Sequence, residues 1–234
     1  MESSANMSNI DKRLRMLERD LARGSKTQIA NMSTLGLWAF ALTTALLQFR
    51  ELDIGATVPG ATGLTIGFAF GFGGLVQLLA GILSALRGNM FQATAFSSFG
   101  GFWLSWASWE LIVRSDEVGL VFDKEAEIGM LMMWALLTLV LFLCSFNTNV
   151  VVSSLFFTLA TLFFLLAGAK YSGSNELKLA ASLWGVFVAA IAFYAGAGEL
   201  MNDQYGRTCI PLGSYEHTHT DRSFNEPRVT LLPK

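Results

Sequence analysis

The sequence predicts an all-α, polytopic membrane protein with six transmembrane helices. Only 15% of the 234 residues are charged and 53% are hydrophobic, whereas charged residues make up about 25% of a typical soluble domain. Five windows without Asp, Glu, Lys or Arg are 20 to 42 residues long, and a membrane-spanning helix needs about 20 apolar residues. The short alternating segments of a transmembrane β-barrel are missing. This composition excludes a soluble enzyme and a nucleic-acid-binding protein.

The number of spans depends on the longest window, residues 128–169. As one helix it would be about 63 Å long, twice the hydrocarbon thickness of about 30 Å. Its only polar cluster is Asn147-Thr148-Asn149, and Asn favours turns, so we expect two helices here. The predicted spans are 30–49, 61–86, 91–113, 128–146, 150–169 and 178–200.

These spans divide the chain into a cytoplasmic N-terminal segment (1–28), a transmembrane domain (29–205) and a cytoplasmic C-terminal tail (206–234). Lys and Arg number 11 on the side of both termini and 5 on the other, which predicts cytoplasmic termini. Apolar residues recur every three or four positions from Met7 to Leu21, as in an amphipathic helix resting on a membrane. A coiled coil with neighbouring subunits is the alternative. We expect the plasma membrane, with an organelle membrane as the other option.

The polar residues within the spans are neutral. No predicted span carries Asp, Glu, Lys, Arg or His near its centre, whereas pumps place such groups at that depth. A path lined by neutral groups suits small uncharged molecules or small anions. We predict substrate contacts at Gln77, Thr43, Thr44 and Ser98. The alternatives are interhelical packing for Gln77 and hydrogen bonds to the same helix for the hydroxyls.

Glycines at Gly60, Gly63, Gly67, Gly71, Gly74 and Gly81 follow spacings of three, four or seven residues. This pattern places them on one face of a regular helix, where small residues allow close packing in lipid or leave room for a solute. No metal or cofactor is expected, because His217 and His219 have no further ligands beside them and the two cysteines lack metal-type spacing.

Four stretches resemble the acetate uptake transporter family, the succinate–acetate permease-like proteins. They are Leu35-Gly36-Leu37 with Phe40 and Thr43-Thr44; Gly73-Gly74-Leu75-Val76-Gln77 with Ala80-Gly81; Gly88-Asn89-Met90-Phe91 with Thr94 to Gly100 and Phe102-Trp103; and Gly198-Glu199 with Asn202, Gln204, Gly206-Arg207-Thr208 and Pro211. Three positions depart from the family pattern: Met32 replaces the Pro of an Asn-Pro pair, Phe99 a Tyr, and Ser84 a Glu.

The resemblance implies a homo-hexamer of six-helix subunits with a separate path in each. It also implies an apolar constriction formed by Phe40, Phe99 and Leu159. We therefore predict membrane transport of small monocarboxylates, acetate first and succinate second, by a channel-like or proton-coupled mechanism. The expected partners are the carboxylate substrate, membrane lipid and other copies of the chain. An exporter of ammonia or ammonium and a non-transporting membrane sensor or scaffold are the alternatives.

Overall fold

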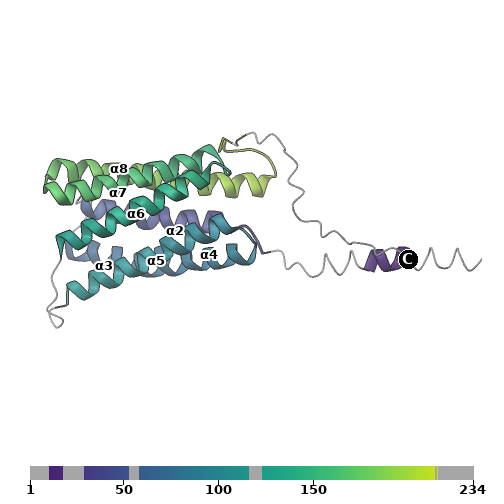
Figure 1. Ribbon diagram of the computed structural model, residues 1–234, viewed down its shortest axis with the longest axis horizontal. Coiled ribbons are helices and arrows are strands. Elements are labelled where there is room, and N and C mark those ends of the chain that lie inside the picture. The colour runs from purple at the N-terminus through teal and green to yellow at the C-terminus, as the bar shows by residue number, and fades with distance from the viewer. Residues whose placement is uncertain (1–10, 18–28, 53–57, 116–122, 214, 216–234) are drawn as a thin grey trace, which may run out of the picture.

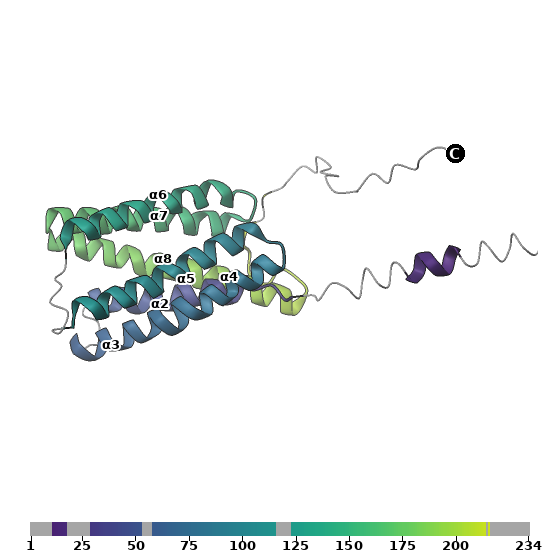
Figure 2. The same cartoon turned by 60° about the horizontal axis from the view of Figure 1, so that its bottom comes forward.

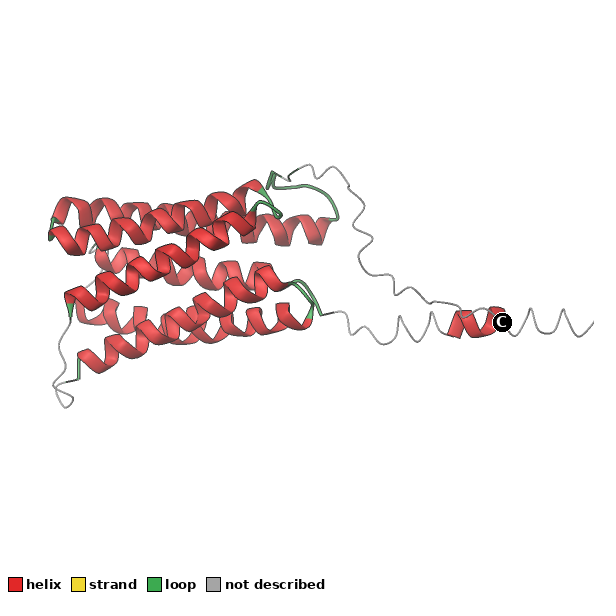
Figure 3. Ribbon diagram, viewed as in Figure 1, coloured by secondary structure: helices red, strands yellow, loops and turns green. Residues whose placement is uncertain are grey.

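The computed structural model describes residues 11–17, 29–52, 58–115, 123–213 and 215. Within these ranges the regular secondary structure is helical and no β-strand is present (Figure 3), which confirms the all-α class. Of the predicted amphipathic segment, residues 11–17 form a short helix whose Leu14, Met16 and Leu17 are exposed. The rest of segment 1–28 and most of the predicted tail lie outside the described residues.

Long helices run along one common direction and form a bundle (Figures 1 and 2). In chain order they are α2 (Ser33–Glu51), α3 (Val58–Phe68), the π-helix η1 (Ala69–Val76), α4 (Gln77–Leu86), α5 (Met90–Val113), α6 (Lys124–Ser145), α7 (Val150–Ser172) and α8 (Asn175–Tyr205). The segments α3, η1 and α4 follow one another without a break, so together they form one rod from residue 58 to residue 86.

Side chains with an oxygen acceptor cap four helices at their first turn. Asn89 accepts from Gln92 N at the start of α5, and Asn149 accepts from Val152 N at the start of α7. Asp123 and Ser174 do the same for α6 and α8. Each cap pairs an amide that the helix itself leaves without an acceptor. The turn between α6 and α7 therefore forms at residues 146–149, where the sequence predicted it.

The π-helix η1 was not predicted, and it changes how the glycines are arranged. Its i→i+5 bonding turns the chain less per residue than an α-helix does, so the glycines no longer share one face. Gly63, Gly67 and Gly71 have open space where a Cβ would lie. In contrast, a Cβ on Gly74 would lie 2.6 Å from the Leu104 side chain, and one on Gly81 would lie 2.3 Å from Ser97 Oγ. The single glycine face is thus replaced by an open part and a part packed against α5.

Four helical runs of described residues are long and apolar enough to cross a membrane: Thr62–Leu86, Lys124–Ser145, Val150–Ser172 and Asn175–Tyr205. The remaining long helices, α2 and α5, are not in this set. Both contain hydroxyl and amide side chains in addition to apolar ones. The count of six transmembrane helices therefore stays a prediction.

Candidate functional site

A cavity of about 470 Å³ extends from the middle of the bundle to the end where α7 turns into α8, since its lining includes Leu159 and also Gly173, Ser174 and Asn175 of that turn. Residues of α2, α5, α6, α7 and α8 line it. Along α2 its wall extends from Phe40 to Glu51, which corresponds to about 16 Å at 1.5 Å per residue. The lining changes over this depth from apolar, through neutral and polar, to charged.

The inner end of the cavity is apolar. It is lined by buried side chains from four helices, namely Phe40, Phe102, Leu131, Leu159 and Phe163. The Phe40 ring packs against the Phe99 ring with centroids 5.5 Å apart, and Phe99 packs against Trp134 at 5.6 Å. The cavity therefore ends against a layer of packed aromatic rings, in the edge-on and tilted arrangements that such rings prefer.

Above this layer the lining is polar, and several buried atoms have no hydrogen-bond partner among the described residues. These atoms are Thr44 Oγ1, Gln48 Oε1, Arg50 Nη1, Trp103 Nε1 and Ser182 Oγ. Buried polar groups in proteins are nearly always paired, with protein or with water. A cluster of unpaired ones in a cavity wall therefore indicates a place for a polar ligand or for water.

The hydroxyl of Thr44 differs from those of most other helical Thr residues here. Thr138, Thr158 and Thr161 donate to carbonyls one turn earlier in their own helices, at 2.6 to 3.0 Å. That is the usual arrangement for a hydroxyl within a helix. Thr44 and its neighbour Thr43 make no such bond, so the hydroxyl of Thr44, a residue of the cavity wall, is buried without a partner among the described residues.

Glycines allow the polar groups from different helices to approach one another. A Cβ on Gly185 of α8 would lie 2.5 Å from Gln48 Cδ, so α2 and α8 are in close contact at this level. A Cβ on Gly73 of η1 would lie 2.8 Å from Thr43 Oγ1 and 2.9 Å from the Trp103 ring. Ser182 is one turn before Gly185 on α8, which places its hydroxyl beside the same part of α2.

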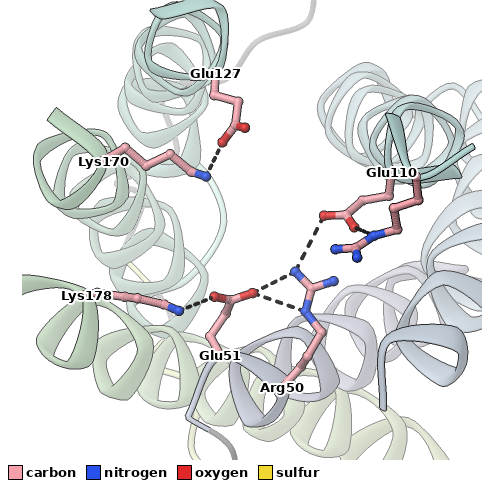
Figure 4. Close-up of polar contacts among 7 residues, drawn as sticks. Arg50, Glu51, Glu110, Glu127, Lys170 and Lys178 are labelled. Carbon is pink, nitrogen blue, oxygen red and sulfur yellow. Dashed lines mark hydrogen bonds and ion pairs between the residues drawn. The ribbon is translucent and has the colours of Figure 1, made fainter. Parts of the chain in front are cut away.

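Ion pairs surround the outer end of the cavity (Figure 4). Arg50 donates to Glu51 through Nε at 3.1 Å and Nη2 at 2.6 Å, and its Nη2 lies 3.5 Å from Glu110 Oε1. Lys178 Nζ is 3.1 Å from Glu51 Oε2, and Lys170 pairs with Glu127. Four basic and three acidic side chains line the cavity, so this end attracts anions only weakly.

Glu51 ends α2, beyond the predicted span 30–49, and its ion pairs affect its titration. Burial alone would raise the pKa of this carboxyl group. The hydrogen bonds and positive charges of Arg50 and Lys178 outweigh that effect and hold the pKa of Glu51 below its usual range. Glu51 is therefore ionised at neutral pH and keeps both cations in place.

The structure brings some of the predicted site residues together. Thr44, Phe40 and Leu159 line the cavity, and Phe99 contacts Phe40 directly below it. The remaining three are placed elsewhere and do not line the cavity. Thr43 faces η1, Gln77 is buried at the η1–α4 junction with Oε1 unpaired, and Ser98 is half-buried on α5.

Four residues of the cavity wall that have an unpaired buried polar atom were not among the predicted substrate contacts: Gln48, Arg50, Trp103 and Ser182. The sequence contained a signal for one of them. Phe40, Thr44 and Gln48 recur every four residues, which places them on one helical face. Trp103 and Ser182 could not be found this way, because they belong to other helices, α5 and α8. Arg50 belongs to α2 but lies off this helical face.

At the end of the bundle opposite the α7–α8 turn, hydrogen bonds join the start of α2 to the last part of α8. Glu199 accepts from Asn31 Nδ2 at 3.2 Å and from Ser33 Oγ at 2.8 Å. The Asn31 side chain also accepts from Ser33 N at 3.1 Å. Asn31 thus forms a side-chain turn just before α2 although Met32 follows it in place of a proline. Ser84, another departure, donates to Ala80 O within its own helix.

After α8 the chain folds back as a strap, residues 206–213. Asn202 Oδ1 accepts from the amides of Cys209 and Ile210 at 2.7 and 2.9 Å. The carbonyl groups of Leu212 and Gly213 then accept from the first amides of α7, those of Val151 and Val150, at 3.2 and 2.8 Å. The strap therefore connects the end of α8 to the start of α7.

Comparison with known proteins places this architecture in a described group. The family described as GPR1/FUN34/yaaH matches residues 15–212. The "Succinate-acetate/proton symporter SatP" of Escherichia coli K12 is 33% identical over 189 residues, which cover 80% of this chain and 97% of that protein. "Ammonia transport outward protein 2" of Saccharomyces cerevisiae is 38% identical over 188 residues, covering 76% of this chain and 64% of that protein.

A solved structure has the same fold. The "Structure of the bacterial acetate channel SatP" superposes with a TM-score of 0.73 and 32% sequence identity, covering 79% of this chain and 99% of that one. The similarity extends over nearly the whole of that protein.

Proposed function

The chain belongs to the GPR1/FUN34/yaaH family, and from this premise we propose that it transports small monocarboxylates, acetate first and succinate second, across a membrane. The observation that carries the proposal is the cavity, in which unpaired polar atoms lie directly above an apolar inner end. Acetate has the same two parts, a carboxylate and a methyl group. The names of the relatives agree with this assignment.

The lining favours a narrow path for the acid together with its proton. No charged side chain lines the inner end of the cavity, and moving an isolated carboxylate through such a layer is very costly. Protonation removes most of that cost, so uptake should follow the fraction of acid that is neutral. Phe40, Phe99 and Leu159 would then set the width of the path, and Thr44 would contact the carboxyl group.

We further propose that the protein is a multi-pass membrane protein with six spans and both termini in the cytoplasm, in the plasma membrane. The cavity then opens on the outside, since it lies opposite the start of α2 and the end of α8 (Figure 1). Gly63, Gly67 and Gly71 offer an open small-residue surface, and such surfaces allow helices to approach closely in lipid. This surface supports assembly as a homo-oligomer, for which we propose a hexamer.

Uptake of labelled acetate into vesicles containing the purified protein tests the proposal. Thr44→Val keeps the shape and removes the free hydroxyl, and Thr161→Val is the matched control because its hydroxyl bonds its own helix. Loss of one hydrogen bond, about 0.5–1.5 kcal/mol, predicts a half-saturating concentration about 2- to 12-fold higher for Thr44→Val. Uptake no faster than in empty vesicles at any pH would refute acetate transport and favour a sensor or scaffold.

Ammonia transport is the second candidate, because a relative of 38% identity is named for it. The neutral middle of the cavity would also accept ammonia. Vesicles loaded with a pH indicator distinguish the two functions. Ammonium flux without acetate flux would establish the second function in place of the first.

A further inference from the structure

Arg50 lies at the outer, charged end of the cavity and makes contacts in three directions. Two of its nitrogens donate to Glu51, and Nη2 also lies near Glu110. Its guanidinium lies over the Trp106 ring, 5.3 Å from the centroid, an attractive arrangement for a cation. Figure 4 shows the guanidinium between the two carboxylates. Three directions of contact thus fix the position of this group.

The remaining nitrogen, Nη1, is buried but has no partner among the described residues. A guanidinium group presents its donors as a planar fork that matches a carboxylate. Since Glu51 and Glu110 occupy one side of the fork, Nη1 is the donor left for a molecule in the cavity. The Arg50 side chain is only 14% exposed, so bulk water does not compete freely for it.

Two further unpaired donors in the same lining come from other helices. Trp103 Nε1 belongs to α5, one turn before Trp106. Ser182 Oγ belongs to α8, one turn after Lys178, which contacts Glu51. The ion pairs of Arg50 reach α5 through Glu110, and α8 through Glu51 and Lys178. Each of these two helices thus also carries one of the two neutral donors.

We propose that Arg50 Nη1, Trp103 Nε1 and Ser182 Oγ form a subsite that binds the ionised carboxylate of the substrate before it takes up a proton from solvent and enters the apolar inner end of the cavity. This inference rests on the proposed function. Glu51 and Glu110 position the guanidinium and reduce its attraction, so that the anion binds but is also released, as conduction requires. The same positive charge disfavours ammonium.

A purely structural role for Arg50 is the competing explanation, since the residue connects α2 to α5. Two inhibitors of the same shape separate the explanations: propionate, which is an anion at neutral pH, and propionamide, which is neutral. Their inhibition of labelled acetate uptake is measured on the wild type and on Arg50→Gln. Arg114→Gln is the matched comparison, because Arg114 pairs with the same Glu110 at 2.7 Å without lining the cavity.

The subsite predicts that wild-type protein is inhibited by propionate at a concentration at least about tenfold lower than by propionamide, as expected for one charged hydrogen bond. Arg50→Gln should lose this preference and Arg114→Gln should retain it. Equal loss of affinity for both inhibitors in Arg50→Gln, with the preference intact, would assign Arg50 a structural role and overturn the inference.

Ser182→Ala keeps the inference testable if Arg50→Gln does not fold. This substitution removes one buried hydroxyl group beside Ala181. It should weaken inhibition by propionate, relative to inhibition by propionamide, by about threefold or more. An unchanged ratio in Ser182→Ala would also overturn the subsite. If the wild type does not transport acetate, both the proposed function and the subsite are refuted. If the wild type transports acetate and the variants keep the wild-type ratio of propionate to propionamide inhibition, only the subsite is refuted.

Discussion

Two adjacent glycines of α5 allow a sharp test of the helix packing. A Cβ on Gly100 would lie 2.6 Å from Leu78 N, 2.9 Å from Leu78 Cα and 3.0 Å from Gly74 O. All three are backbone atoms, so no side-chain rotation can relieve the contact. A Cβ on Gly101 would meet nothing within 4 Å. Gly100→Ala and Gly101→Ala therefore add the same methyl group to the same helix in opposite environments.

The expected displacement follows from these distances. Ordinary contact begins at 3.4 Å, so α5 must move about 0.8 Å away from the η1–α4 rod to accommodate the methyl group of Gly100→Ala. Overpacking of this kind costs about 1–3 kcal/mol. Gly101→Ala should be neutral or stabilising by about 0.5–1 kcal/mol, because Ala is a better helix former than Gly.

Thermal unfolding of both purified variants in one detergent measures the difference. We expect a lower melting temperature for Gly100→Ala and an equal or higher one for Gly101→Ala. Slower acetate uptake is expected for Gly100→Ala, because Trp103 lies one turn further along the displaced helix. Equal melting temperatures for the two variants would refute the close approach of α5 to Leu78.

Three further predictions concern other parts of the molecule. Leu159→Ala should admit bulkier monocarboxylates in an uptake competition assay, whereas Leu143→Ala, at a position 66% exposed, should leave the substrate range unchanged. The interactions that lower the pKa of Glu51 stabilise the folded state at pH values above the usual carboxyl pKa. This stabilisation is lost as the pH falls through the lowered pKa. In a plot of melting temperature against pH, Glu51→Gln should therefore flatten the decline over that range. Gly67→Leu should reduce the mass, found by light scattering, of the oligomer that we propose, since a Cβ at this position meets none of the described residues within 4 Å and the added side chain would extend from an exposed position.

Much of the fold was predictable because charges are excluded from apolar spans and Asn residues favour turns. The windows between charges located the helices, and Asn149 marked the boundary of α6 and α7. The π-helix was not predictable in this way. Residues 69–76 contain no polar side chain, and such a composition suits an α-helix as well as a π-helix. Gly73 and Gly74 of this stretch fit closely against Thr43, Trp103 and Leu104 of other helices, and such contacts cannot be deduced from the local sequence.

The site was predictable only in part, for a related reason. Thr44 and Phe40 share a face of one helix, so their spacing in the sequence is enough to predict that they lie together. Ser98 and Gln77 are polar residues in apolar stretches too, yet neither lines the cavity. Which side of a helix meets a cavity depends on the rotation of that helix in the bundle, and apolar residues surround these two positions too evenly to define it.

The strap gives α7 and α8 a mechanical property that neither helix has alone. A two-residue turn joins them at the cavity end, and hydrogen bonds from Val150 and Val151 to the strap close the other end. The two helices are thus connected at both ends, and Leu159 and Ser182 lie on them between the two connections. Separating α7 from α8 would therefore require breaking one of these connections in addition to the packing between the two helices.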